Sequence, residues 1–170
     1  MKVPCNEAID AQIDLTQLGI ALTAKPIVFG GMAMEFYGLR PHGHDIDLFV
    51  TFEDYAALAA KYPESRKDIW GDLGVVVEPF EIWRSIWKLG YEFFLEGAIE
   101  FDRYFVLSPE KLLLSKVLAM DTSDKQRKDL EQVTTYIREQ NAIPEVVDYM
   151  NARVEIYLKA PDGTVFGGKY

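Results

Sequence analysis

The feature that most constrains the fold is a pair of short apolar segments, each with residues suited to a site at one end. Pro26-Ile27-Val28-Phe29 runs directly into Gly30-Gly31, which is typical of a buried strand that turns sharply into the next element. The stretch 45–50 begins with alternating acidic and apolar residues and then becomes wholly apolar. A strand shows this pattern when it begins at a site and continues into the core.

The acids of the second segment suit a divalent cation. Residues i and i+2 of a strand lie on one face, about 6.6 Å apart, so Asp45 and Asp47 are expected to project together. Mg²⁺ prefers oxygen ligands and usually keeps waters and substrate phosphates in its shell. Gly30 and Gly31 allow close backbone approach and offer N–H groups to a phosphate at the start of a helix. The sequence therefore predicts a cation site facing an anion site.

Each half of this pattern also has a plainer interpretation. An isolated Asp-x-Asp is commonly a solvated strand end, and an isolated glycine pair is usually only a turn. The order of the two, each joined to an apolar strand, favours a joint site.

The remaining pattern predicts an α+β fold. Further strands are expected at 74–77 and 99–107, and an aromatic segment around Trp83, Trp87 and Tyr91 has helical character. Helices are expected at 6–18, 32–37, 51–60, 108–120 and 124–140, with another after Pro144. The expected architecture is a mixed β-sheet flanked by helices in a core of residues 1–107. A C-terminal helical extension, 108–170, would pack on that core as one compact unit and end in a β-hairpin over 154–166.

Composition and charge narrow the possible partners. The formal net charge is −9, which argues against broad binding to a polyanion, because that affinity comes from many Lys and Arg contacts to phosphate. No apolar run approaches the roughly 20 residues needed to cross a bilayer, and no secretory signal is visible at the N-terminus. The single Cys5 fits a reducing compartment. We expect a cytoplasmic protein without a membrane partner.

The glycine pair, the short helix, the basic turn 40–44 and Asp45-Ile46-Asp47 resemble the signature of the nucleotidyltransferase superfamily, which includes DNA polymerase β, antibiotic nucleotidyltransferases and AbiEii-type toxins. A second stretch, 106–116 followed by 127–131, is similar to the helix pair that follows the core in AbiEii-like and related uncharacterised families. The resemblance spans about residues 26–137 and implies a nucleotidyltransferase fold.

The resemblance also implies a reaction, the transfer of a nucleoside monophosphate from an NTP to a hydroxyl acceptor. In the family, two acids of one strand bind two Mg²⁺ ions and a third acid from a neighbouring strand completes the site. Asp45 and Asp47 match the first two. We take Glu78 as the third, where the family usually has Asp, with Glu81 as the alternative. The acceptor could be tRNA or another RNA, a protein or a small molecule, and a toxin of this kind could have an antitoxin protein as partner.

Three basic residues are candidates for binding the nucleotide. Lys116 shares a helical face with Leu112 and Leu113 and should point inward. Its stem could cover the core while the ammonium reaches water, or, as the resemblance suggests, its charge could serve the nucleotide. Arg40 and His44 flank the acids and could contact phosphate or acceptor. An alternative of another class is a module of the same fold that binds a nucleotide or a partner without catalysis.

Overall fold

The computed structural model describes residues 9–69, 71–119, 121, 123–141, 159 and 161. The chain divides into two compact units, 1–136 and 137–170. The sheet, the helices named below that precede α6, and the start of α6 belong to the first unit. Among the described residues, none of the helices combines the length and the apolar character needed to span a membrane.

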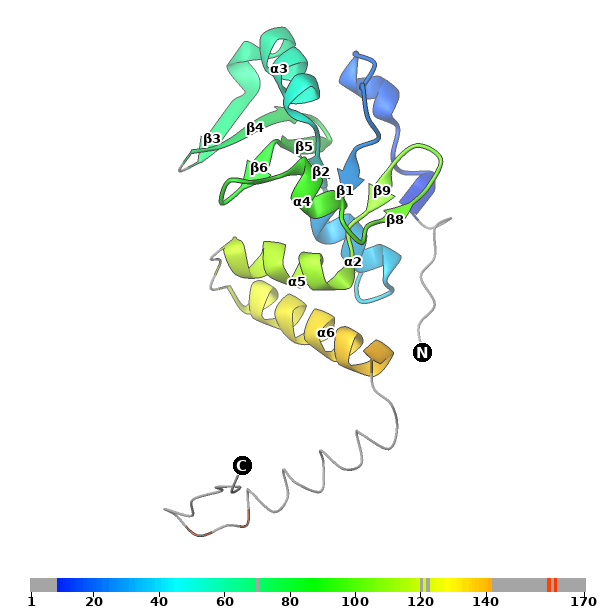
Figure 1. Cartoon of the computed structure of the whole chain (residues 1–170), viewed down its shortest axis with the longest axis vertical. Coiled ribbons are helices and arrows are strands. Elements are labelled where there is room, and N and C mark those ends of the chain that lie inside the picture. The colour runs from blue at the N-terminus through cyan, green and yellow to red at the C-terminus, as the bar shows by residue number, and fades with distance from the viewer. Residues whose placement is uncertain are drawn as a thin grey trace. The chain divides into compact units, whose positions relative to one another are not determined.

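A mixed sheet forms the centre of the first unit (Figure 1). Its strands lie in the order β3-β4-β5-β2-β1-β9-β8. The bounds are β1 Ile27–Val28, β2 Ile46–Phe49, β3 Arg66–Ile69, β4 Asp72–Val77, β5 Phe80–Trp83, β8 Ile99–Glu100 and β9 Phe105–Val106. The pairs β2/β5 and β1/β9 are parallel and the other neighbours are antiparallel. The expected α+β class with a mixed sheet is therefore confirmed. A separate hairpin pairs β6 Ser85–Ile86 with β7 Leu89–Gly90.

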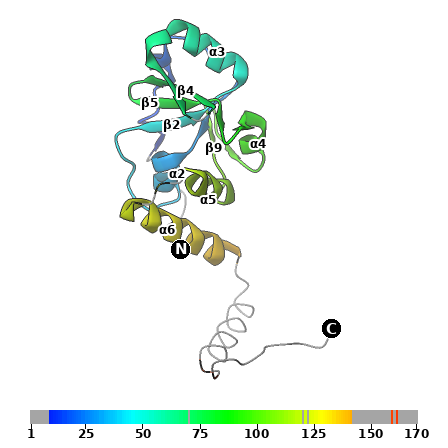
Figure 2. The ribbon, with the colours of Figure 1, turned by 90° about the vertical axis from the view of Figure 1, so that its left-hand side faces the viewer.

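Helices lie on both sides of the sheet. Figure 2 shows α3 on one side and α2 and α5 on the other. The helices and 3-10 helices are η1 Leu15–Leu18, α2 Gly30–Phe36, α3 Phe52–Lys61, η2 Pro63–Ser65, α4 Tyr91–Leu95, α5 Pro109–Leu118 and α6 Asp124–Asn141. Thr51 caps α3 and Ser108 caps α5, each by accepting a hydrogen bond from a backbone N–H three residues on. The helices expected at 51–60, 108–120 and 124–140 are confirmed within two residues at each end.

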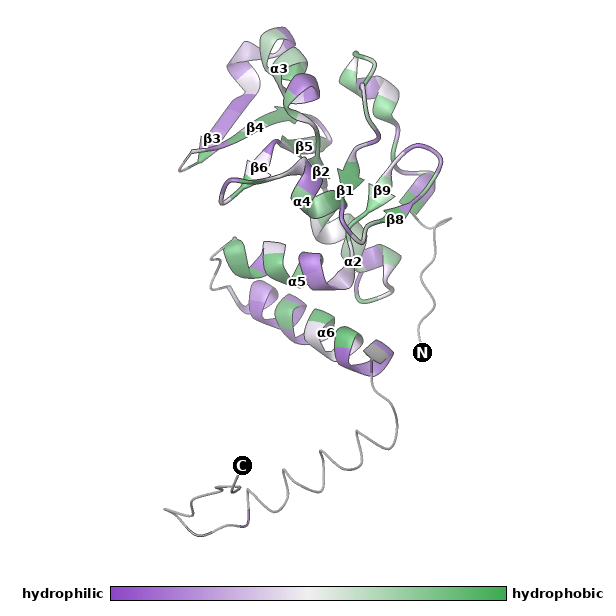
Figure 3. Ribbon diagram, in the orientation of Figure 1, coloured by the Kyte–Doolittle hydropathy of each residue, from purple (hydrophilic) through white to green (hydrophobic). Residues whose placement is uncertain are grey.

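The core lies between the central strands and the helices. Ile27, Val28, Leu48 and Phe49 are fully buried, and Figure 3 shows β1 and β4 as hydrophobic where the edge strand β3 is mainly hydrophilic. The ring of Phe49 stacks on Phe29 and on Phe94, with 4.1 Å between centroids in both pairs. These stacked rings fix the position of β2 relative to the start of α2 and to α4.

The structure corrects three expected elements. The continuous helix at 6–18 is wrong over its described part, where helical residues 9 and 10 are followed by a turn and by η1. Asp14 caps η1 by accepting from the backbone N–H of Thr16, so a local polar bond replaces helix continuation. The strand expected at 99–107 is two short strands, β8 and β9, joined by a turn in which the Phe101 N–H donates to the Tyr104 carbonyl.

The aromatic segment is also not a helix throughout. Trp83 ends β5, Trp87 lies in the turn between β6 and β7, and Tyr91 begins α4. Residues 80–83 form a strand and not a helix because β5 pairs with both β2 and β4. Such tertiary pairing overrides the weak local helical preference of aromatic residues. The expected helix after Pro144 and the hairpin over 154–166 lie outside the described residues, apart from residues 159 and 161.

Candidate functional site

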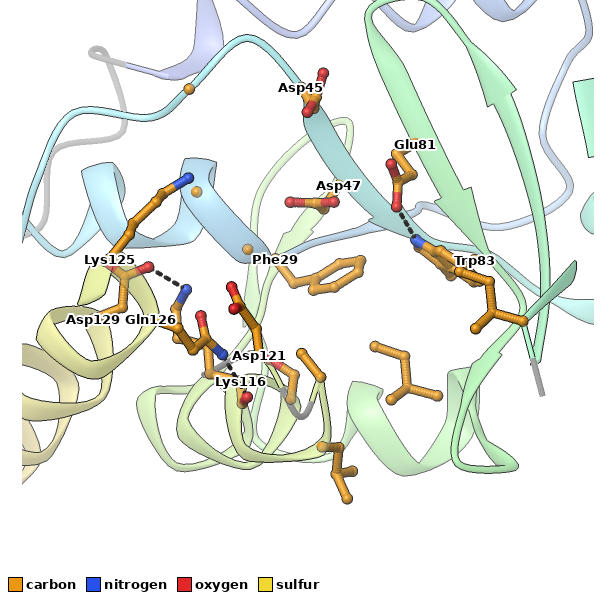
Figure 4. A pocket seen from close by; sticks show the side chains of 18 of the residues that line it. Phe29, Asp45, Asp47, Glu81, Trp83, Lys116, Asp121, Lys125, Gln126 and Asp129 are labelled. Carbon is orange, nitrogen blue, oxygen red and sulfur yellow. Dashed lines mark hydrogen bonds and ion pairs between the residues drawn. The ribbon is translucent and has the colours of Figure 1, made fainter. Parts of the chain in front are cut away.

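The parallel pairing of β2 and β5 brings acidic residues together. Asp47 lies opposite Glu81 in this register, and residues that face each other across neighbouring strands project from the same face of a sheet. Asp45, just before β2, lines the same cleft as Asp47 and Glu81. The cleft has a volume of about 370 Å³, within the range of roughly 300–1,000 Å³ typical of small-molecule sites. Figure 4 shows the three acids on neighbouring strands, with Lys116 and Asp129 across the cleft.

The glycine turn packs directly against Asp47. Gly30 has a φ of +58°, and a Cβ atom there would lie 1.9 Å from the Asp47 Oδ2. Both the left-handed backbone and this contact require glycine. The Phe29 N–H donates to the Asp47 carbonyl at 3.0 Å, and the Gly31 N–H donates to the Asp47 carboxylate. The expected neighbours Gly30 and Gly31 thus lie at the cleft, and both line it.

Asp47 is held where its charge is disfavoured. Burial is the main cause that raises the pKa of its carboxyl from 3.8 to about 7, and the negative charges of Glu81 and Asp45 raise it further. The hydrogen bond from Gly31 and the charge of Lys116 act in the opposite direction. A divalent cation in this cleft would remove the repulsion between the acids, so the donor set fits a hard metal ion such as Mg²⁺.

Glu81 is held by two neighbours. Its Oε1 accepts from the Trp83 Nε1–H at 3.0 Å, and its Oε2 accepts from the Lys67 ammonium at 2.7 Å. Lys67 belongs to β3, and its ammonium also lies 5.7 Å from the centre of the Trp83 ring. The Lys67 pair therefore places a positive charge beside Glu81.

Glu78 is not brought to the cleft, which corrects its expected place beside the aspartates. Strand β4 ends at Val77, which pairs with Phe80, so Glu78 and Pro79 form the connecting turn. Glu78 is exposed there and does not line the cleft, whereas Glu81 does. The sequence signal that could have found Glu81 is the alternation of 80–83, which marks a new strand directly after the turn.

The two expected cations converge on an acid to which sequence reasoning gave no role. Asp129 of α6 accepts from Arg40 Nε at 2.5 Å and from Arg40 Nη2 at 2.7 Å. It also accepts from Lys116 Nζ at 2.6 Å. Burial opposes ionisation of Asp129, but the hydrogen bonds and charges of both cations hold its pKa below the usual value. The Lys116 side chain is only 9% exposed, so its ammonium does not reach water in the way that snorkelling requires.

The histidines of the basic turn do not line the cleft. His44 is exposed and is not among the residues that line the cleft. The His42 N–H donates to Glu35 at 2.7 Å, and its ring Nε2 lies 2.5 Å from the Gln12 side-chain oxygen. Arg40 is thus the residue of this turn that brings a charged side chain to the cleft.

Part of the lining of the cleft is apolar, and sequence reasoning did not predict it. It is formed by Phe29, Ile69, Trp83, Ile86, Trp87 and Leu118. Two of these come from the β6–β7 hairpin, whose short strands leave little periodicity to detect. The cleft therefore combines acidic and aromatic side chains, and a lining of apolar and a few polar groups is typical of small-molecule sites.

Comparison with known proteins gives no family assignment. No protein-family model and no curated protein matches this chain. Within the described parts of the chain, no three His, Cys, Asp or Glu side chains are already arranged as a metal-binding group. The residues of the cleft and the resemblance of their sequence pattern are therefore the basis for a functional proposal.

Proposed function

We propose that this protein is a metal-dependent nucleotidyltransferase that transfers a nucleoside monophosphate from an NTP to a hydroxyl group. The single observation that carries the proposal is the meeting of Asp45, Asp47 and Glu81 in one cleft, with Gly30 and Gly31 against Asp47. The sequence around these residues resembles the nucleotidyltransferase signature, and the mixed sheet is compatible with that fold.

The metal would be held by Asp45 and Asp47. Their carboxylate oxygens are the donors that Mg²⁺ prefers. Burial first, and the charges of Glu81 and Asp45 second, raise the pKa of Asp47, and a bound cation would lower it again. When bound, two Mg²⁺ ions would balance the charge of the phosphates and of the reacting oxygens. Glu81 joins this set only if it exchanges its bonds to Lys67 and Trp83 for the metal or the acceptor.

The phosphates would lie between the acids and the basic residues. Gly30 and Gly31 line the cleft beside Asp47, so the triphosphate would pass next to their backbone. Arg40 and Lys116 carry two positive charges against the single negative charge of Asp129. One positive charge of this group is therefore left to attract an anion at the edge of the cleft.

In the proposed step, the acceptor oxygen attacks the α-phosphorus and forms a new P–O bond. The bond between the α-phosphorus and the bridging oxygen breaks, and pyrophosphate leaves with that electron pair. The Glu81 carboxylate takes the proton of the acceptor hydroxyl. Glu81 lines the cleft beside the two aspartates, within reach of an acceptor bound there.

By resemblance, the acceptor is an RNA such as tRNA, a protein or a small hydroxylated compound. The net charge of −9 and the acidic cleft favour the last two, because a polyanionic acceptor would be repelled. If the chain acts as a toxin, an antitoxin protein would be its natural partner.

A second candidate function is nucleotide binding without transfer. Both oxygens of Glu81 are already hydrogen-bonded, and Asp129 occupies Arg40 and Lys116. If these bonds persist when a nucleotide binds, the third acid cannot accept a proton and the cleft serves as a binding module.

The proposal is tested by labelling an acceptor from α-labelled NTP with Mg²⁺, using protein, RNA and small-molecule fractions of a cell extract. Asp45→Asn and Asp47→Asn should abolish labelling, because the metal loses its ligands. Glu81→Gln should reduce labelling by about 100-fold or more, as expected for loss of a general base. Glu78→Gln, a matched acid outside the cleft, should label like the wild type.

Absence of labelling by the wild type with all four NTPs would leave the binding module as the better account. Equal loss in Glu78→Gln and Glu81→Gln would show that the cleft acids are not assigned correctly. Circular dichroism of each variant separates lost chemistry from lost folding.

A further inference from the structure

The turn between β6 and β7 has an unusual backbone. Trp87 and Lys88 both have positive φ angles, 51° and 63°. Where both residues of a two-residue hairpin turn have positive φ, they are usually Gly, Asn or Asp, because the left-handed region is disfavoured for residues with a bulky side chain. A tryptophan at this position keeps a conformation that its side chain opposes, and such strain clusters at functional sites.

Asp72 holds this turn in place. One carboxylate oxygen accepts from the Trp87 N–H at 2.6 Å, and the other accepts from the Lys88 N–H at 3.0 Å and from the Ser85 hydroxyl at 2.9 Å. Both oxygens of Asp72 are therefore committed to the hairpin. The same carboxylate fixes both strained residues, so the position of the Trp87 ring is set before any ligand arrives.

The Trp87 ring is placed at the cleft and left open to solvent. It is 53% exposed, yet it lines the same cleft as the acids. Its Nε1–H donates to the Leu118 carbonyl at the end of α5 at 2.8 Å. This bond ties the hairpin to α5 and satisfies the polar atom of the indole. What the ring offers to a ligand is therefore its apolar face.

We propose that Trp87 is the stacking platform for the nucleobase of the bound nucleotide. This inference rests on the proposed function and assigns the base end of the same cleft. Ile69, 43% exposed, and Trp83 extend the apolar wall beside it. Base stacking on an aromatic ring tolerates every base, because each has a π face. Since the indole N–H is already bonded, Trp87 selects for a planar ring and not for one base.

The test compares a ligand that carries a nucleoside with one that does not, and the Trp87 variants isolate the part of the difference that depends on the ring. Binding of a non-hydrolysable NTP and of inorganic tripolyphosphate, each with Mg²⁺, is measured by calorimetry. Trp87→Ala should weaken binding of the NTP analogue by about tenfold or more and leave tripolyphosphate binding within about twofold. Trp87→Phe, which keeps a ring but lacks the N–H bond to Leu118, should bind the analogue within about threefold of wild type. Phe52→Ala removes an equally exposed ring outside the cleft and should change neither.

The outcomes separate this inference from the proposed function. If Trp87→Ala weakens both ligands equally, Trp87 only supports the cleft and the stacking role is wrong. If the wild type binds tripolyphosphate as tightly as the nucleotide, the base makes no contact, and the inference fails while the phosphate site stands. If the wild type binds neither ligand, the proposed function fails and the inference with it. Should Trp87→Ala not fold, Trp87→Leu against Trp87→Phe decides the same question, because leucine fills space without an aromatic face.

Discussion

At the scale of single residues, Asp47 links the chemistry of the cleft to the stability of the protein. Its pKa of about 7 in the folded state lies above the ordinary 3.8, so the folded protein holds the proton more tightly than the unfolded chain. Stability is therefore lost as the pH rises from about 4 to 7. Asp47→Asn removes this loss. We expect its free energy of unfolding to exceed that of wild type by on the order of 2 kcal/mol at pH 8, and by much less at pH 5.

Urea unfolding of both proteins at pH 5 and pH 8, in the presence of EDTA, measures this difference. Glu78→Gln serves as the control for loss of a carboxylate, because this exposed acid lies outside the cleft. A stabilisation of Asp47→Asn that is the same at both pH values would show that the effect comes from packing and not from the charge.

The same residues show how far the sequence predicts the site. Asp45 and Asp47 are predictable because the strand period alone puts them together. Glu81 depends on where β4 ends and on its register with β2, neither of which is encoded within a few residues. Asp129 meets Arg40 across 89 sequence positions, and only the packing of α6 against the turn before β2 brings the two side chains together.

At the scale of elements, the sequence correctly predicted those helices whose starts are fixed by hydrogen bonds between near neighbours in the chain. Thr51 and Ser108 cap their helices through hydrogen bonds within one turn, and these helices follow from the sequence. The segment 83–91 depends on strand pairing and on the bonds of Asp72 to the β6–β7 turn. Its aromatic residues are compatible with both a helix and a strand, so the sequence alone did not distinguish between these two structures.

Asp129 joins three elements, and this gives a prediction for α6. Asp129→Ala removes the partner of Lys116, whose side chain is 9% exposed, and leaves an unpaired charge in the interior. Removal of one partner of a buried pair costs about 3–5 kcal/mol. We expect a loss of unfolding free energy of about 3 kcal/mol at pH 7, measured by chemical denaturation. This is the lower end of the range, because Arg40, the second partner of Asp129, is partly exposed and can be hydrated.

A double-mutant cycle isolates the pair. In a Lys116→Met background, Asp129→Ala should cost at least about 1 kcal/mol less than in wild type, because no buried ammonium is then left without a partner. Asp124→Asn, which alters the exposed pair with Arg127, is the matched control on the same helix and should cause no measurable change. Equal costs of Asp129→Ala in both backgrounds would show that Lys116 and Asp129 do not depend on each other.

At the scale of the whole molecule, negative charge limits which ligands the cleft can bind. The protein carries a net charge of −9, and its cleft gathers Asp45, Asp47 and Glu81 at one end. An NTP bears several negative charges of its own, so it would be repelled without cations. The proposed metal therefore has two effects, because it relieves the repulsion among the acids and also makes the cleft attractive to the triphosphate.

This coupling predicts how the whole protein responds to ligands. A non-hydrolysable NTP with Mg²⁺, at about 100 times its Kd, should stabilise the protein by about 2.7 kcal/mol, which corresponds to a rise in Tm of about 5–10 °C for a chain of this size. Either component alone should give a much smaller rise, because the nucleotide without Mg²⁺ is repelled by the acids and Mg²⁺ without the nucleotide lacks the phosphate oxygens that complete its shell. Thermal unfolding with Mg²⁺, with the analogue, and with both measures the coupling.

The Asp45→Asn, Asp47→Asn double variant should lose the joint rise, whereas Glu78→Gln should keep it. A rise that persists in EDTA would contradict a metal-bridged triphosphate, because the nucleotide would then bind without the cation that the acids require. A full joint rise in a protein that labels no acceptor would identify binding without transfer. In that case, the bonds of Glu81 to Lys67 and Trp83 would explain why no general base accepts the proton of the acceptor.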